Sequence, residues 1–168
     1  ARVALCEASL AHRFGNDVIA DTPLKTVILA NGEPDADGVT ASDFLEGQGT
    51  RLDCADTNSH DMAFWMYSSG STGKPKGIVH LHHDMAYTQQ SFGRHVLGLL
   101  ADDICFSVPK IYFAYGFGNS ITFPFSVGAT TLLMPGQPRP NAVLDVIERY
   151  RPTILFGLPT LYTALARS

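Results

Sequence analysis

The stretch YSSGSTGKPKG, from Tyr67 to Gly77, carries the residue types that hold an anion. Glycines and small residues let successive backbone N–H groups point into one concavity, and hydroxyls add neutral donors around it. Lys74 and Lys76 supply positive charge. Because nothing in the stretch can fill a hydrophobic core, we expect a loop that binds phosphate oxygens. The alternative is a solvated glycine-serine turn that joins two strands.

This loop differs from the commonest phosphate-binding loop, GxxxxGK[ST]. Aligning Gly73 and Lys74 with that pattern puts Ser68 where the first glycine belongs and Pro75 where the metal-binding hydroxyl belongs. Pro75 also lacks an N–H and biases Lys74 toward extended backbone, so no helix begins directly after the lysine. The sequence therefore indicates a different class of phosphate loop.

The elements around the loop predict an α/β fold. Apolar spacing predicts helices up to about residue 10 and over 40–49, 84–99, 112–128 and 141–150, and from Thr160 on. Apolar runs bounded by turn residues predict strands over 25–31, 62–69, 77–83, 103–109, 129–135 and 153–159. Strands that alternate with helices imply right-handed crossovers and a largely parallel sheet with flanking helices.

Parallel α/β sheets bind ligands at the carboxyl ends of their strands. The phosphate loop follows such an end after Tyr67, and two further loops, around 109–118 and 157–160, also follow strands. We therefore expect these three loops to converge on one edge of the sheet.

Composition and charge exclude several classes of protein. The 168 residues are 45% hydrophobic and 17% charged, which is typical of a globular protein of single-domain size. A net charge of -4 argues against a broad nucleic-acid-binding surface. Three widely spaced cysteines predict neither a disulfide framework nor a zinc knuckle. Without a signal-peptide pattern or an apolar run of about 20 residues, the sequence favours a cytoplasmic protein.

The order of residues in the loop carries a family resemblance. YSSGSTGKPKGIVH, residues 67–80, resembles the signature loop of the adenylate-forming enzymes, the superfamily of acyl- and aryl-CoA ligases, luciferases and carrier-loading adenylation domains. Residues 110–165 are similar to the second conserved block of that superfamily, and FAYGFGN, residues 113–119, is similar to its benzoate-CoA ligase branch. The resemblance covers the chain from about Asp61 to its end.

The resemblance implies a domain organisation. The chain would be a fragment of the larger N-terminal domain of an adenylate-forming enzyme, and the C-terminal domain would be absent. Residues 1–60 match only in their helix-strand-loop layout and would form a lead-in, whereas residues 61–168 would carry the phosphate loop and the aryl-acid pocket.

The resemblance also implies that the loop wraps the β- and γ-phosphates of ATP. A carboxylate is a poor electrophile, and joining it to AMP expels pyrophosphate, whose developing charge must meet preorganised donors. CoA thiolate would then attack the acyl-adenylate. The implied phosphate-binding residues are hydroxyl donors, glycines that permit close backbone approach, and two cations: Ser68, Ser69, Ser71 and Thr72; Gly70, Gly73 and Gly77; Lys74 and Lys76.

Two segments are candidates for the acid pocket. In benzoate-type ligases the Ala-Tyr-Gly of the second block lines the aryl site, which implies Ala114, Tyr115 and Gly116 here. The alternative is that the aromatic residues of this block form the core face of an amphipathic helix. In FGLPTLY, Gly157 and Pro159 break a strand end and let the backbone approach the substrate, or else form a plain strand-to-helix turn.

Three histidines raise the question of a metal site. His80 and His82 would share one face of a strand, and His83 follows them. Only Asp84 stands at a supporting spacing, and structural histidines are commoner than ligands, so we predict no metal held by these side chains. Mg²⁺ would be carried mainly by the phosphates of ATP.

The leading hypothesis is an ATP-dependent aryl carboxylate-CoA ligase acting on benzoate or a hydroxybenzoate, with ATP, Mg²⁺ and CoA, and with no nucleic-acid or membrane partner. The alternatives are an adenylation module that loads a carrier protein and a nucleotide-binding module without chemistry. The family's catalytic lysine and its adenine, ribose and magnesium motifs lie outside these residues, so we predict that the isolated chain is inactive. The ring substituents and the oligomeric state, including a homodimer, stay open.

Overall fold

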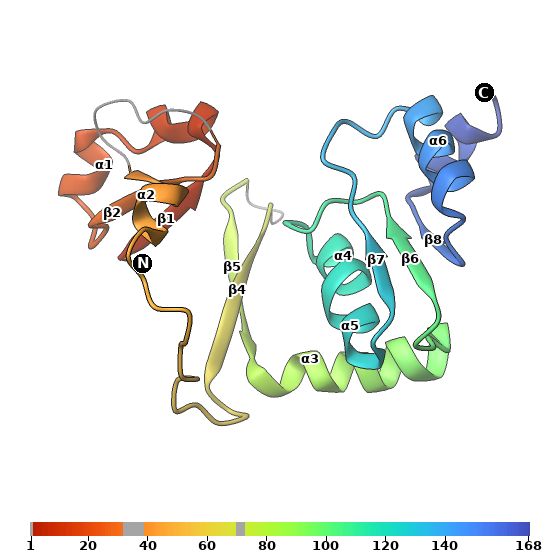
Figure 1. Cartoon of the computed structure of the whole chain (residues 1–168), viewed down its shortest axis with the longest axis horizontal. Coiled ribbons are helices and arrows are strands. Elements are labelled where there is room, and N and C mark those ends of the chain that lie inside the picture. The colour runs from red at the N-terminus through yellow and green to blue at the C-terminus, as the bar shows by residue number, and fades with distance from the viewer. Residues whose placement is uncertain (1, 32–38, 70–72) are drawn as a thin grey trace. The chain divides into compact units, whose positions relative to one another are not determined.

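The computed structural model describes residues 2–31, 39–69 and 73–168 (Figure 1). The chain divides into two compact units, Ala1–Ala55 and Asp56–Ser168. Gly70, Ser71 and Thr72 of the predicted phosphate loop lie outside the described residues.

The first unit is built on a parallel sheet with the strand order β1-β2-β3. Its central strand β2 is buried through Val27, Ile28 and Leu29. The Thr40 hydroxyl accepts a hydrogen bond from the Asp43 N–H at 3.0 Å and begins the short helix α2. The elements are β1 (Val3–Cys6), η1 (Ala8–Arg13), α1 (Asn16–Ala20), β2 (Thr26–Leu29), β3 (Val39–Thr40) and α2 (Ala41–Leu45).

The sequence prediction of a helix up to about residue 10 is wrong. Val3–Cys6 form a strand that pairs in register with β2, from Val3 opposite Thr26 to Cys6 opposite Leu29, and a 3₁₀-helix follows. Pairing with the buried strand β2 satisfies the backbone of this segment, and such tertiary pairing overrides a weak helical spacing.

The second unit begins with an antiparallel hairpin of β4 (Met62–Ser68) and β5 (Lys76–Leu81). A long helix follows, α3 (His82–Thr88) continued by the π-helical η2 (Gln89–Leu97). The predicted strands and helix are therefore present. However, the phosphate loop joins two antiparallel strands, so its expected place at the carboxyl edge of a parallel sheet is wrong. His82 begins α3, so it does not share a strand face with His80 either.

The rest of the second unit is a parallel sheet with the order β7-β6-β8. Its elements are β6 (Ile104–Ser107), α4 (Ala114–Phe117), η3 (Gly118–Thr122), α5 (Phe123–Val127), β7 (Thr130–Leu132), α6 (Pro140–Tyr150), β8 (Ile154–Phe156) and α7 (Pro159–Leu165). These elements confirm the α/β class and the helices and strands expected from residue 103 onward. Buried side chains around β6 form the core: Leu99, Cys105, Phe106, Val108, Val143 and Phe156.

The strand order places a crevice beside β6. The chain leaves β6 for β7 on one side and returns past it to β8 on the other. With right-handed crossovers, the two connections cover opposite faces of the sheet, and ligands of such sheets bind where the order reverses. The loops after β6 and β8 flank this point.

Candidate functional site

The hairpin positions the described part of the phosphate loop. Ser68 ends β4 opposite Lys76, and Tyr67 pairs with Gly77. Gly73 has a φ of +75°, a left-handed conformation that favours glycine, so its place in the loop has a backbone reason. A Cβ on Gly77 would lie 3.4 Å from the Tyr67 ring, which is ordinary van der Waals contact, so packing alone does not require glycine here.

The described loop residues fit a polyphosphate. Ser68, Ser69, Lys74 and Lys76 are all exposed, so their hydroxyl and ammonium groups are accessible from solvent. Hydroxyl donors and two cations around a turn with a left-handed glycine suit the charge and the oxygen atoms of phosphate groups. The fit covers the loop on either side of residues 70–72, and its role in binding the phosphates of ATP stays a prediction.

Tyr115 lies on the short helix α4 and is half-exposed. Partial burial and the nearby Tyr162 raise the pKa of Tyr115 above its ordinary value, against a smaller lowering by a side-chain hydrogen bond with Asn119. Asn119 is 1% exposed, and its Oδ1 atom has no hydrogen-bond partner. Tyr115 therefore stands between solvent and a buried polar side chain.

Gly116 has a packing role that the sequence did not reveal. A Cβ at this position would lie 2.0 Å from the Lys110 carbonyl oxygen and 2.5 Å from the Pro109 carbonyl oxygen. Only glycine lets α4 approach the backbone of the turn that follows β6. Gly116 thus fixes the position of Ala114 and Tyr115, its neighbours on the same helix.

Gly157 and Pro159 form the turn from β8 into α7. A Cβ on Gly157 would lie 2.9 Å from Leu161 and 3.2 Å from the Tyr162 ring, so α7 covers this glycine. Pro159 is exposed as the first residue of α7. The Tyr162 hydroxyl donates a 2.9 Å hydrogen bond to the Leu155 carbonyl and holds its ring over Gly157. The strand-to-helix turn considered for this segment is present.

A cavity of about 630 Å³ lies at the crevice beside β6. Lys110 helps to shape it, because its Nζ donates to the carbonyl oxygens of Met134 and Gly136 and ties two loops together. The expected convergence is therefore confirmed for the loops after β6 and β8, although the lining includes neighbours of the predicted pocket residues rather than those residues themselves. From these two loops it includes Val108, Pro109, Tyr112, Phe113, Leu158 and Thr160.

A second cavity, of about 150 Å³, lies between the β4–β5 hairpin and α4. Ala114 of the predicted aryl pocket lines it, together with Phe64 of β4 and Phe117 of α4. Four polar residues also line it, His80, Asp84, Thr88 and Thr122, and the two threonine hydroxyls donate to the backbone carbonyls of Asp84 and Gly118. The sequence analysis weighed His80 and Asp84 as metal ligands and predicted no metal there, and the structure places both beside this largely apolar cavity.

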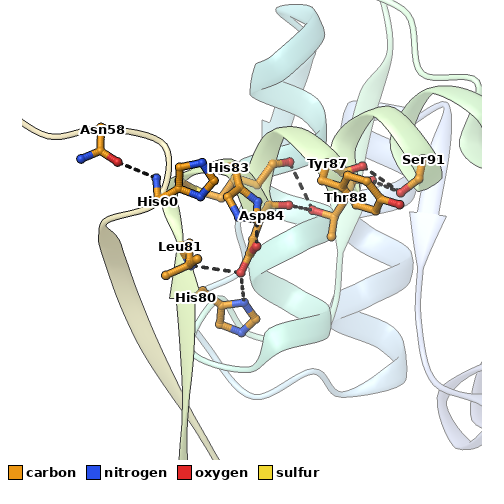
Figure 2. A network of polar contacts seen from close by, with 10 residues as sticks. Asn58, His60, His80, Leu81, His83, Asp84, Tyr87, Thr88 and Ser91 are labelled. Carbon is orange, nitrogen blue, oxygen red and sulfur yellow. Dashed lines mark hydrogen bonds and ion pairs between the residues drawn. The ribbon is translucent and has the colours of Figure 1, made fainter.

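Asp84 organises the junction of the hairpin and α3, as Figure 2 shows. Its Oδ2 accepts a 3.0 Å hydrogen bond from the Leu81 N–H and lies 3.4 Å from His80 Nδ1, and its Oδ1 lies 3.1 Å from His83 Nδ1. Among the described residues no group of three or more His, Cys, Asp or Glu side chains could hold a metal ion. The pairing gives Asp84 a capping role at the start of α3.

Cys105 is not suited to nucleophilic chemistry. It is fully buried in the core of the parallel sheet, and burial together with the nearby Asp103 carboxylate raises the pKa of its thiol to about 11. The thiolate, which is the reactive form, is therefore suppressed at neutral pH. Separately, no helix among the described residues is both long and apolar enough to cross a membrane.

All 168 residues match the family described as AMP-binding enzyme. The chain belongs to this family. It is 39% identical over 165 residues to the benzoate-CoA ligase of Thauera aromatica, covering 98% of this chain and 31% of that protein. It is 39% identical over 153 residues to the 4-hydroxybenzoate-CoA/benzoate-CoA ligase of Rhodopseudomonas palustris, covering 89% of this chain and 28% of that protein.

The fold of this AMP-binding chain matches solved structures. The crystal structure of the anthranilate-CoA ligase AuaEII in complex with anthranoyl-AMP superposes with a TM-score of 0.90 at 34% identity, over 98% of this chain and 32% of that one. The chain therefore has the fold of a segment of an adenylate-forming enzyme and spans about a third of the length of these relatives.

Proposed function

We propose that the full-length protein uses ATP to convert an aromatic carboxylate to an acyl-adenylate and then to its CoA thioester. The observation that carries the proposal is the 39% identity to a benzoate-CoA ligase over 98% of this chain, including the phosphate loop and the FAYGFGN segment. The chain spans 31% of that relative, so the reaction belongs to the longer protein.

The loop residues contribute charge stabilisation. Lys74 and Lys76 place ammonium groups on one exposed loop, and the hydroxyls of Ser68 and Ser69 stand at its other end. Negative charge develops on the departing pyrophosphate, and donors already in place stabilise it without reorganisation. Mg²⁺, bound mainly through ATP oxygens, adds further charge neutralisation.

The α4 segment contributes the acid-binding wall. Because Gly116 has no side chain, α4 packs directly against the backbone at Pro109 and Lys110. This backbone packing fixes the position of Ala114 and Tyr115. A small side chain at Ala114 leaves room beside the aromatic ring of Phe117. This arrangement favours a flat substrate ring over a bulky aliphatic chain.

The test is acid-dependent pyrophosphate release by the full-length protein with ATP, Mg²⁺ and CoA. The acids are benzoate, hydroxybenzoates, aminobenzoates and short fatty acids. We expect release with at least one aromatic acid and a loss of about 100-fold in kcat for Lys74→Ala, as for the loss of one donor that stabilises the transition state. Lys25→Ala, which changes an exposed lysine of the first unit, is the matched control and should keep the wild-type rate.

Tyr115→Ala tests the acid wall separately. We expect the KM for the aromatic acid to rise while the KM for ATP stays near wild type. Tyr150→Ala is the matched control, because Tyr150 on α6 has the same 46% exposure as Tyr115. Equal effects of the two substitutions would argue against a substrate contact at Tyr115.

Other results would redirect the proposal. If no acid in the panel stimulates release, the ligase proposal fails and the non-catalytic nucleotide-binding alternative gains. Adenylate formation without transfer to CoA would favour loading of a carrier protein. Turnover by the isolated 168-residue chain would contradict the prediction that it is inactive alone. Cytoplasmic location stays a prediction, and the oligomeric state stays open.

A further inference from the structure

The 150 Å³ cavity has the size of one aromatic ring. An apolar protein cavity of about this volume accommodates benzene, so a single six-membered ring fits and a fused bicyclic ring does not. The strands and helices around it contribute apolar side chains that suit such a ring, including Phe64, Met66, Met85, Phe117 and Phe123.

Aromatic packing holds two of the walls in place. The Phe64 ring stacks on the His80 imidazole with centroids 4.9 Å apart and an interplanar angle of 19°. Phe117 of α4 forms another wall of the cavity, and its ring centroid lies 5.1 Å from that of Phe64. These contacts fix the plane of His80 at the cavity surface.

The polar residues of the cavity are two threonines, whose hydroxyls donate to the backbone carbonyls of Asp84 and Gly118, and a histidine oriented by a carboxylate. His80 Nδ1 lies 3.4 Å from Asp84 Oδ2, which the Leu81 N–H also holds at 3.0 Å (Figure 2). A carboxylate accepts, so this pairing favours the proton on Nδ1. In the neutral ring Nε2 is then a hydrogen-bond acceptor.

The side chains of His80 and Asp84 are about one-third exposed, so water reaches this pair from outside the cavity. Within the lining, however, the neighbours of His80 are mainly hydrocarbon and aromatic side chains. An acceptor among such neighbours discriminates between a ring that brings a donor and a ring that brings only C–H groups. Sites built to bind a substrate hydroxyl reject the analogue that lacks it, because the protein group is left unpaired.

We propose that this cavity receives the ring of the aromatic acid and that His80 selects rings carrying a hydroxyl or amino donor. This inference rests on the proposed aryl-acid ligase function. Asp84 acts through His80 as a positioning residue, since it orients the imidazole and caps α3 but offers both of its oxygens to protein partners.

The experiment compares kcat/KM for benzoate, the hydroxybenzoates and the aminobenzoates in the full-length protein and its His80→Leu variant. In the wild type we expect at least one donor-bearing acid to exceed benzoate by tenfold or more. His80→Leu should lower that ratio about tenfold or more, with the value for benzoate changed less than threefold. His83→Leu is the matched control, because His83 also pairs with Asp84 but does not line the cavity.

Two features keep the test decisive if His80→Leu reduces the folded fraction. The ratio between two acids is measured on one preparation, so inactive protein cancels from it. His80→Gln retains a hydrogen-bond acceptor, and we expect it to restore part of the preference. Asp84→Asn should weaken the preference less than His80→Leu, because the amide still accepts from the Leu81 N–H.

The outcomes separate this inference from the proposed function. Aryl-acid-dependent release with no preference for donor-bearing rings, or with equal losses for every acid in His80→Leu, would overturn the role of His80 and indicate that other residues of the longer chain fill the cavity. Absence of aryl-acid-dependent release in the wild type would overturn the proposed function itself. Efficient use of a fused bicyclic acid, undiminished in His80→Leu, would place the ring elsewhere.

Discussion

The β4–β5 hairpin and the parallel sheet around β6 differ in how deeply their side chains are buried. Phe106 at the centre of the parallel sheet is completely buried among side chains of α6 and α7, and Cys105 next to it packs with side chains of η2 and α5. Trp65 and Tyr67 on the hairpin are 54% and 69% exposed. The hairpin nevertheless carries the phosphate loop, whereas the parallel sheet supplies the helix against which the acid is expected to lie.

The difference shows that the buried parallel sheet supplies the core of the second unit, whereas the hairpin holds its loop at an exposed position. Side chains alternate along β4, so Phe64 and Met66 face the cavity while Trp65 and Tyr67 lie on the opposite face. Among the described residues, the Phe64 face of the hairpin packs against Phe117, and the Asp84 junction holds the end of β5. The loop between these strands is therefore supported from the Phe64 face, while Trp65 and Tyr67 stay exposed.

The largest expected effect comes from Phe106→Ala in the parallel sheet. Removing a fully buried aromatic side chain costs about 3–5 kcal/mol of the free energy of unfolding. Urea unfolding of the full-length protein measures it. Trp65→Ala in the hairpin should cost clearly less, and an equal cost would break the comparison by showing that another part of the protein covers the hairpin.

Gly116→Ala tests the backbone contact that fixes α4. The added methyl group would overlap the Lys110 carbonyl, so we expect a loss of about 1–3 kcal/mol in unfolding free energy and a higher KM for the aromatic acid. Gly136→Ala is the matched control, since a Cβ there meets nothing within 4 Å. Wild-type stability and KM in Gly116→Ala would contradict the close packing.

Asp84→Ala tests the junction that anchors the hairpin. Loss of the acceptor for the Leu81 N–H at the start of α3 should cost about 1 kcal/mol, and Asp84→Asn should cost less because its amide oxygen can still accept. Thermal unfolding of the two variants in parallel measures the difference. Identical unfolding midpoints for Asp84→Ala and Asp84→Asn would show that Asp84 does not stabilise α3 as a cap.

The smallest expected effect concerns Tyr115 at alkaline pH. Because folding raises the pKa of Tyr115, its contribution to stability is complete below the unfolded-state pKa, about 10, and is lost as pH rises through the higher folded-state value. The unfolding midpoint of the wild type should therefore fall relative to that of Tyr115→Phe as the pH rises above about 10. An absorbance titration at alkaline pH should also show that the phenol absent from Tyr115→Phe ionises late.

The sequence could predict most of the second unit because its apolar runs and turn residues agree with the local structure. It failed at Val3–Cys6, where pairing with β2 decides the conformation. The antiparallel hairpin could have been predicted, since the loop 69–75 is too short for the crossover of a dozen or more residues that parallel strands need.

The candidate site was less accessible to prediction. Gly73 and the lysines are recognisable because their chemistry is local. The pattern from Leu81 to Asp84 could also have been interpreted as a helix cap rather than a ligand. In contrast, the contact of Gly116 with the Lys110 carbonyl and the stacking of Phe64 on His80 depend on how turns and strands fold back, which side-chain types alone do not specify.

The strand register also has a consequence for the order of folding. The two strands of the hairpin are joined by the short loop 69–75, whereas the Ile104 N–H on β6 donates a hydrogen bond to the hydroxyl of Thr153, which lies 49 residues further along the chain. Closing the longer loop costs more entropy and takes longer. During synthesis the phosphate loop can therefore reach its hairpin before the ribosome has delivered the strand that completes the scaffold.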